Sequence, residues 1–319
     1  MKLKESKHSL LYASDCYVSD ATLPKIHKVK DPDDYVNLLT HDQIQIGLCE
    51  IRGHRTEQED AIAIDTSALI QSFKTLSQHQ QHHVYECALN EIQNQYGQYQ
   101  TTGSTACIAT AWRDDRAFYL STANLGDSAA YFILLDDNQT ISIATQINAL
   151  HNPSPELPEF DRLRKLGIKP YEDGLWRLPS GLAVSRALGD IDSERCGLIH
   201  IPEMTYHVYP YEKKSLAFIV VACDGLTEQD ILNAKKIGHI VQHHYSESPD
   251  KIALALVNAA YDQGSVNGSA DNISVIVFPV IEHVISAAVF DGHGGNQVSE
   301  TASGHLYSIM HQHLNQPLT

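Results

Sequence analysis

The sequence lacks long apolar runs and any excess of basic residues. No apolar run approaches the length of a transmembrane helix, so we expect neither a membrane span nor a cleaved signal peptide. The 39 acidic residues outnumber the 23 lysine and arginine residues, which gives a formal net charge of −16. This balance argues against nucleic acid or an anionic membrane surface as the main partner, because both are bound through basic side chains.

The sequence also lacks closely spaced cysteines. Its six cysteines are scattered, and none forms a Cys-x-x-Cys pair. Most lie in apolar segments, where a free thiol packs as a small hydrophobic group. We therefore expect reduced cysteines and a cytoplasmic location, either in the producing cell or in a cell to which the protein is exported. The absence of a Gly-x-Ser-x-Gly motif argues against a serine hydrolase.

The hydrophobic pattern predicts a single domain over residues 43–319, with no internal repeat and no linker. Residues 44–48 alternate like a half-buried strand, and residues 217–223 are a continuous apolar strand. Residues 67–100 are polar and favour helix. Residues 1–42 are polar and mixed, and we predict an N-terminal extension of unknown role.

Acidic residues recur at the ends of the apolar strands, mostly beside glycine or asparagine. Each Asp-Gly pair alone could be a hairpin turn. After Gly295, however, apolar residues recur at helical spacing, so the chain there runs from strand through acid and glycines into a helix. The recurring acids are Asp60, Asp127, Asp224, Asp271 and Asp291.

Five carboxylates at one sheet edge would repel one another unless cations neutralise them. Oxygen ligands without cysteine and with few histidines favour Mg²⁺ or Mn²⁺. Two such ions can activate water and stabilise a displacement at phosphorus. Arg55 is the candidate that would hold the phosphate oxygens.

Seven short motifs together resemble the metal-dependent (type 2C) serine/threonine protein phosphatases over roughly residues 44–315. The resemblance implies an α+β fold, a sandwich of two antiparallel β-sheets flanked by helices, with two or three Mn²⁺ or Mg²⁺ ions between the sheets. The motifs are Arg55-x3-Glu59-Asp60, Gly103-Ser104-Thr105-Ala106, Gly126-Asp127-Ser128, Leu182-Ala183-Val184-Ser185-Arg186-Ala187-Leu188-Gly189-Asp190, Asp224-Gly225, Asp271-Asn272 and Asp291-Gly292-His293-Gly294-Gly295.

The resemblance also implies residue roles. Arg55 binds phosphate, and His293 is the general acid for the leaving oxygen. Glu59 and Asn272 do not bind the ions and instead support the residues that do. The implied metal ligands are Asp60, Asp127, Asp224, Asp271, Asp291 and the carbonyl of Gly292.

The order of the motifs departs from that of the family, in which the Asp-Gly-His-Gly-Gly strand precedes Gly-Ser-Thr-Ala. Here residues 65–100 take that place, and the segment stands at the C-terminus, which is a non-cyclic permutation. We expect residues 272–280 and 284–291 to form an antiparallel hairpin that brings Asp291 beside Asp271. Exchange of the segment between two chains is the alternative.

We predict a metal-dependent phosphatase that removes phosphate from phosphoserine and phosphothreonine in a protein substrate, acts in signalling and is a monomer. The alternative is a phosphatase-like binding module with little or no activity. The acid pair in Asp190-Ile191-Asp192 is set aside, because it lacks a preceding apolar strand.

Overall fold

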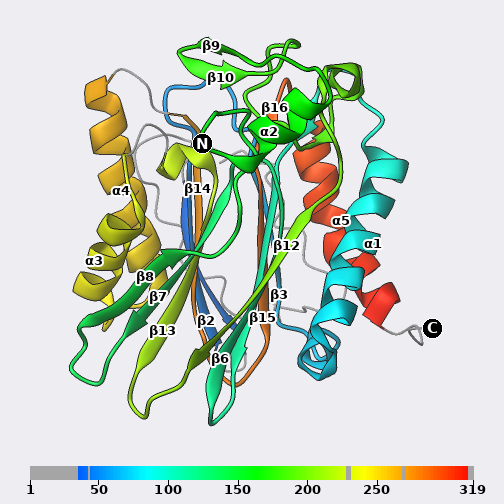
Figure 1. Ribbon diagram of the computed structural model, residues 1–319. Coiled ribbons are helices and arrows are strands. Elements are labelled where there is room, and N and C mark those ends of the chain that lie inside the picture. Colours follow the sequence, from blue (N-terminus) through cyan, green and yellow to red (C-terminus); the bar gives the residue numbers. More distant parts are fainter. Residues whose placement is uncertain (1–34, 42–43, 228–230, 268–270, 315–319) are drawn as a thin grey trace, which may run out of the picture.

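Two antiparallel β-sheets pack face to face in the computed structural model, and helices cover their outer faces (Figure 1). The structure describes residues 35–41, 44–227, 231–267 and 271–314. Within these ranges, no helix is long and apolar enough to cross a membrane. The arrangement confirms the predicted α+β sandwich.

The strands are apolar on both faces because each sheet packs against the other sheet on one side and against helices on the other. Facing side chains such as Phe132, Phe278 and Val289 form the central core. The six-stranded sheet has the order β1 (Tyr35–His41), β2 (Ile44–Ile51), β14 (Ile273–Pro279), β13 (Leu216–Ala222), β7 (Ala129–Leu135) and β8 (Ile141–Gln146). The five-stranded sheet has the order β12 (Glu203–Pro210), β6 (Ala117–Leu125), β5 (Ala106–Arg113), β15 (Ile285–Phe290) and β3 (Ala61–Asp65).

Four long helices form the two outer layers. The six-stranded sheet is covered by α3 (Ala234–His244) and α4 (Pro249–Asn267), and the five-stranded sheet by α1 (Gln78–Tyr96) and α5 (Gln297–Leu314) (Figure 1). Helix α1 begins at a capping box, in which Ser77 and Gln80 each accept a hydrogen bond from the other's backbone N–H. It confirms the helical prediction for residues 67–100.

Short elements close the end of the sandwich at which β15 ends. Three two-residue strands form a small sheet there, in the order β11 (Leu188–Gly189), β4 (Gly103–Ser104) and β16 (Gly292–His293). The remaining elements are η1 (Ile70–Thr75), α2 (Pro158–Lys165), β9 (Tyr171–Asp173), β10 (Leu175–Arg177), η2 (Ile191–Cys196) and η3 (Asp224–Leu226).

The predicted N-terminal extension falls mostly outside the described residues. Its last part is β1, which pairs along its whole length with β2 at the edge of the six-stranded sheet. The sheet therefore begins at Tyr35, before the boundary predicted at residue 43.

The predicted hairpin between residues 272–280 and 284–291 is wrong. Strand β14 lies between β2 and β13 in one sheet, whereas β15 lies between β3 and β5 in the other. The chain crosses from sheet to sheet between them, because β15 is buried on both faces and fills a central position in the five-stranded sheet. Asp271 precedes β14 and Asp291 follows β15, so both still lie at the same end of the sandwich.

A buried chain of hydroxyl groups fixes the C-terminal segment against the rest of the domain. Tyr85 on α1 donates to Thr110 on β5 at 2.7 Å, and Thr110 contacts the Ser286 hydroxyl on β15 at 2.7 Å. Tyr307 on α5 donates to Ser286 at 3.1 Å. Satisfied buried polar groups of this kind specify one arrangement, because a shifted strand would leave them without partners.

Candidate metal centre and active site

A pocket at this end of the sandwich brings together seven of the predicted site residues. They lie near the ends of strands of both sheets, in loops, in η3 or in the short strand β16, so each sheet supplies part of the lining. The seven are Arg55, Asp127, Asp224, Asp271, Asp291, Gly292 and His293. Thr105 and residues 175, 177 and 181–184 complete the lining.

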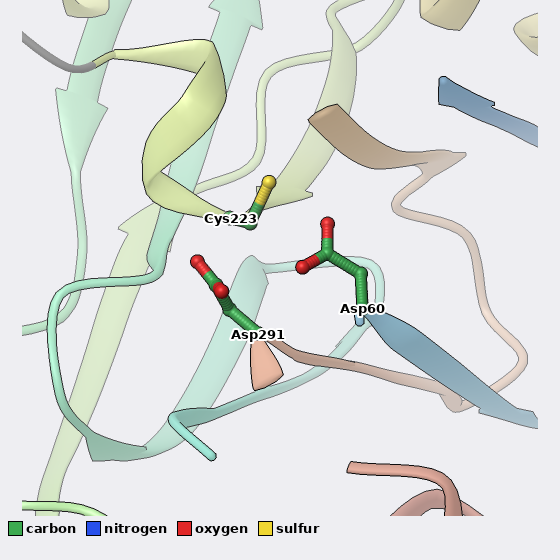
Figure 2. Close-up of side chains that lie close together, drawn as sticks. All are labelled: Asp60, Cys223 and Asp291. Atoms are coloured by element: carbon green, nitrogen blue, oxygen red, sulfur yellow. The ribbon is translucent and has the colours of Figure 1, made fainter. Parts of the chain in front are cut away.

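A fifth predicted acid, Asp60, lies directly before β3. One carboxylate oxygen of Asp60, one of Asp291 and the sulfur of Cys223 lie within 4.8 Å of one another. Figure 2 shows the three side chains close together. Both carboxylate oxygens of Asp60 are buried and have no hydrogen-bond partner among the described residues. A buried polar group without a partner is costly, and a cation would satisfy it.

The electrostatics of these carboxylates also fit a cation. Burial raises the pKa of Asp60 to about 6. Burial, together with the charges of Asp60 and Asp224, raises the pKa of Asp291 well above its ordinary value. A divalent cation would favour the ionised forms and remove the repulsion between them.

Cys223 stands beside these acids, but its sulfur has other partners. Its Sγ donates to the carbonyl of Asn272 at 3.3 Å and accepts from the backbone N–H of Ser274 at 3.1 Å. Burial raises the pKa of the Cys223 thiol well above its ordinary value, so it stays protonated. A protonated thiol is a poor ligand for a hard cation, and Cys223 is best understood as a packing group that joins β13 to β14.

Asn272 holds the loop that carries Arg55. Its side-chain oxygen accepts from the backbone N–H of Glu59 at 3.0 Å, and its amide nitrogen donates to the carbonyls of Arg52 and Glu57 at 2.9 and 3.0 Å. Three backbone contacts from one side chain fix the loop against the start of β14. The Arg55 guanidinium, 55% exposed, pairs with the Asp271 carboxylate at the mouth of the pocket.

Glu59 joins this loop to the glycine-rich segment after β15. Its carboxylate accepts from the backbone N–H of Gly295 at 2.6 Å, and its carbonyl accepts from the Ser299 hydroxyl at 2.5 Å. A Cβ at Gly292 would lie 2.3 Å from that same carbonyl oxygen. Only glycine permits this close approach, which holds the loop that carries Asp60 against the segment that carries Asp291.

Asp127 follows β6 and also lines the pocket. Its carboxylate accepts a hydrogen bond of 2.7 Å from the side chain of Asn152. Burial raises the pKa of Asp127, so it too is a carboxylate whose charge lacks solvation. Asp224 opens η3 and lines the same pocket.

Two pocket features were missed by sequence reasoning. Asp190, which that reasoning set aside, is 2% exposed and places Oδ2 at 2.5 Å from Nε2 of His293. The strand before it, β11, has only two residues, too few for a hydrophobic pattern. Arg177, which lines the pocket and donates to the carbonyl of Gly181 at 2.9 Å, gave no signal beyond its charge.

Comparisons with known proteins indicate one family. A family profile described as Protein phosphatase 2C matches residues 45–269. The integrin-linked kinase-associated serine/threonine phosphatase 2C of Homo sapiens is 31% identical over 184 residues, which cover 55% of this chain and 44% of that protein. Probable protein phosphatase 2C 61 of Arabidopsis thaliana is 30% identical over 189 residues, which cover 55% of this chain and 54% of that protein.

A solved structure of serine-threonine phosphatase 2C from Toxoplasma gondii has the same fold, with a TM-score of 0.53 at 16% identity. The alignment covers 76% of this chain and 96% of that one. This chain spans about half or less of the length of the curated relatives described above. The profile match ends at residue 269, before Asp271 and before the C-terminal segment that carries Asp291.

Proposed function

The chain belongs to the protein phosphatase 2C family, and we propose that it hydrolyses phosphoserine and phosphothreonine esters in proteins with Mn²⁺ or Mg²⁺ as its cofactor. The observation that carries the proposal is the buried carboxylate of Asp60, which has no hydrogen-bond partner among the described residues and lies beside Asp291. In a domain of this family, such a carboxylate supports a catalytic metal centre.

The residues that would hold two ions are the acids that meet at the pocket together with one backbone carbonyl. Bound there, the ions would activate a water molecule and neutralise phosphate charge. Asp127 and Asp224 would hold a third ion. The proposed ligands are Asp60, Asp127, Asp224, Asp271, Asp291 and the carbonyl of Gly292.

The chain's own side chains supply the remaining chemistry. Arg55 would exchange Asp271 for the phosphate oxygens, which it can bind in bidentate fashion. His293 would give a proton to the leaving serine or threonine oxygen. Glu59 and Asn272 would keep the Arg55 loop in register with the metal ligands.

We also propose that the segment from Ile285 to Leu314 is transposed relative to the usual order of the family and acts within its own chain. Two observations support this. Strand β15 pairs with both β3 and β5, and it delivers Asp291 to Asp60 without a second chain. The profile match, which ends at residue 269, leaves this segment out.

Hydrolysis of p-nitrophenyl phosphate and of a phosphothreonine peptide, with and without Mn²⁺ or Mg²⁺, tests the proposal. Removal of a side chain that hydrogen-bonds to a metal ligand lowers activity by about 10–100-fold. Asp291→Asn changes a ligand itself and should therefore lower activity by at least about 100-fold. Asp137→Asn, an exposed acid on a distant turn, is the matched control and should retain full activity. A wild-type protein that binds the peptide but turns over neither substrate would instead support the binding-module alternative.

A further inference from the structure

A buried carboxylate stands directly behind the proposed general acid. His293 lies in β16 and lines the pocket, whereas Asp190 is 2% exposed. Asp190 Oδ2 lies 2.5 Å from Nε2 of His293. An ionised carboxylate only accepts hydrogen bonds, so Nε2 must carry the hydrogen. Nδ1 is then the ring nitrogen left for the substrate.

The local backbone is arranged around this contact. Asp190 has a φ of 51°, a left-handed conformation that is uncommon outside glycine but tolerated by aspartate and asparagine. Its backbone N–H donates to the carbonyl of Thr102 at 3.1 Å, which fixes it beside β4. A Cβ at Gly103 would lie 1.9 Å from Asp190 Oδ2 and 2.6 Å from Nε2 of His293. The contact therefore requires glycine at position 103.

We propose that Asp190 is a positioning residue, which holds the His293 ring so that the leaving oxygen takes its proton from Nδ1. The inference rests on the proposed function. In the step concerned, the His293 ring starts with a hydrogen on each nitrogen. The water oxygen forms a bond to phosphorus, and the ester oxygen departs with the electron pair of the broken P–O bond and takes the proton from Nδ1, which leaves the ring neutral with its hydrogen on Nε2. The proton released by the attacking water restores His293.

The two possible roles of Asp190 can be told apart with two substrates. Loss of a contact that positions the general acid lowers kcat according to how much the leaving group needs a proton, whereas loss of a contact that only stabilises the fold does not depend on the leaving group. Nitrophenolate leaves readily without a proton, whereas a threonine alkoxide requires one. A positioning residue should therefore affect kcat for a phosphothreonine peptide far more than kcat for p-nitrophenyl phosphate. A residue that only stabilises the fold or the metal centre would lower both by the same factor.

The test variant is Asp190→Asn, because asparagine has the same shape and also tolerates a positive φ. Asp192→Asn, an exposed acid two residues away, is the matched control. We expect Asp190→Asn to lose about 10–100-fold in kcat on the peptide, with KM unchanged and with little loss on p-nitrophenyl phosphate. Asp192→Asn should match the wild type on both substrates.

A double-mutant cycle asks whether Asp190 acts through His293. If it does, His293→Asn and His293→Asn with Asp190→Asn should have the same peptide kcat, because the ring that Asp190 positions is already gone. Equal losses on the two substrates, or losses that add in the double variant, would overturn the proposal.

Long-range ¹H–¹⁵N NMR of the His293 ring decides the point without any turnover. We expect hydrogen on Nε2 in the wild type and an altered Nε2 signal in Asp190→Asn but not in Asp192→Asn. A wild-type ring without hydrogen on Nε2 contradicts the inference even if the enzyme is active. An inactive wild type with the expected ring signals would refute the proposed function and leave the positioning contact in place.

Discussion

Glu50 is a buried acid near Asp60 of the proposed metal centre, and its replacement by glutamine should stabilise the protein in a pH-dependent way. The side chain lies in β2 and is 4% exposed. Its Oε1 accepts a hydrogen bond of 3.3 Å from Ser274. Burial, with the charge of Asp60 as the second cause, raises the pKa of Glu50 from 4.5 to about 8.

The direction of this pH dependence follows from which state of the chain, folded or unfolded, holds the proton of Glu50. Below pH 4.5, Glu50 is protonated in both the folded and the unfolded chain and has no effect. Between that pH and about 8, the unfolded chain releases the proton while the folded chain keeps it, so the free energy of unfolding falls as pH rises. Each pKa unit corresponds to about 1.4 kcal/mol, so the full shift amounts to about 5 kcal/mol.

Urea unfolding in EDTA at several pH values between 4.5 and 8.5 measures this difference. Glu50→Gln has no proton to lose, so its advantage over the wild type should be near zero at the acidic end and should grow to several kcal/mol at the basic end. Glu57→Gln, an exposed acid in the next loop, is the control and should change the free energy of unfolding by less than about 0.5 kcal/mol throughout. A Glu50→Gln advantage that does not grow with pH would refute the reasoning.

Three further predictions concern the metal centre and the C-terminal segment. Gly292→Ala should fold but bind Mn²⁺ at least about tenfold more weakly, because its Cβ would press on the Glu59 carbonyl. Calorimetry measures this affinity, and an unchanged value would contradict the close approach. Mn²⁺ at 100 times its Kd should raise the free energy of unfolding of the wild type by about 2.7 kcal/mol, and a thermal scan should show no such gain for Asp291→Asn. A chain that ends at residue 284 should show no folded state when measured by circular dichroism. It would lose five fully buried side chains that together contribute about 10 kcal/mol to stability, namely Ile285, Val289, Phe290, Leu306 and Met310. This loss is as large as the whole stability of a typical domain.

Much of the site could be predicted because its chemistry is local in sequence. A buried strand that ends in Asp-Gly presents a carboxylate at a sheet edge, whichever strands pair beside it. Asp224 and Asp291 were found in this way, and both line the pocket. The sequence therefore indicated which residues meet without indicating how their strands pair.

Strand pairing was harder to predict because it depends on contacts between distant residues. The sequence between β14 and β15 is short enough for a hairpin, and only the competition for pairing partners excludes one. Both neighbours of β14, β2 and β13, are apolar strands that precede it in the chain, so no edge is left for β15. Asp190 was missed for a related reason, since its role depends on a histidine 103 positions away.

The order of the five-stranded sheet explains how a terminal segment can occupy its interior. Strands β3 and β5 are both antiparallel to β15, so they run parallel to each other and need a crossover connection, which α1 supplies. That crossover leaves a gap one strand wide, bounded by two unpaired edges. Residues from any part of the chain can fill the gap if they are apolar on both faces and can enter from the opposite sheet. Strand β15 satisfies both conditions, and the helix that follows it packs beside α1. The position of Asp291 is therefore fixed by the gap between β3 and β5 and not by its place in the sequence.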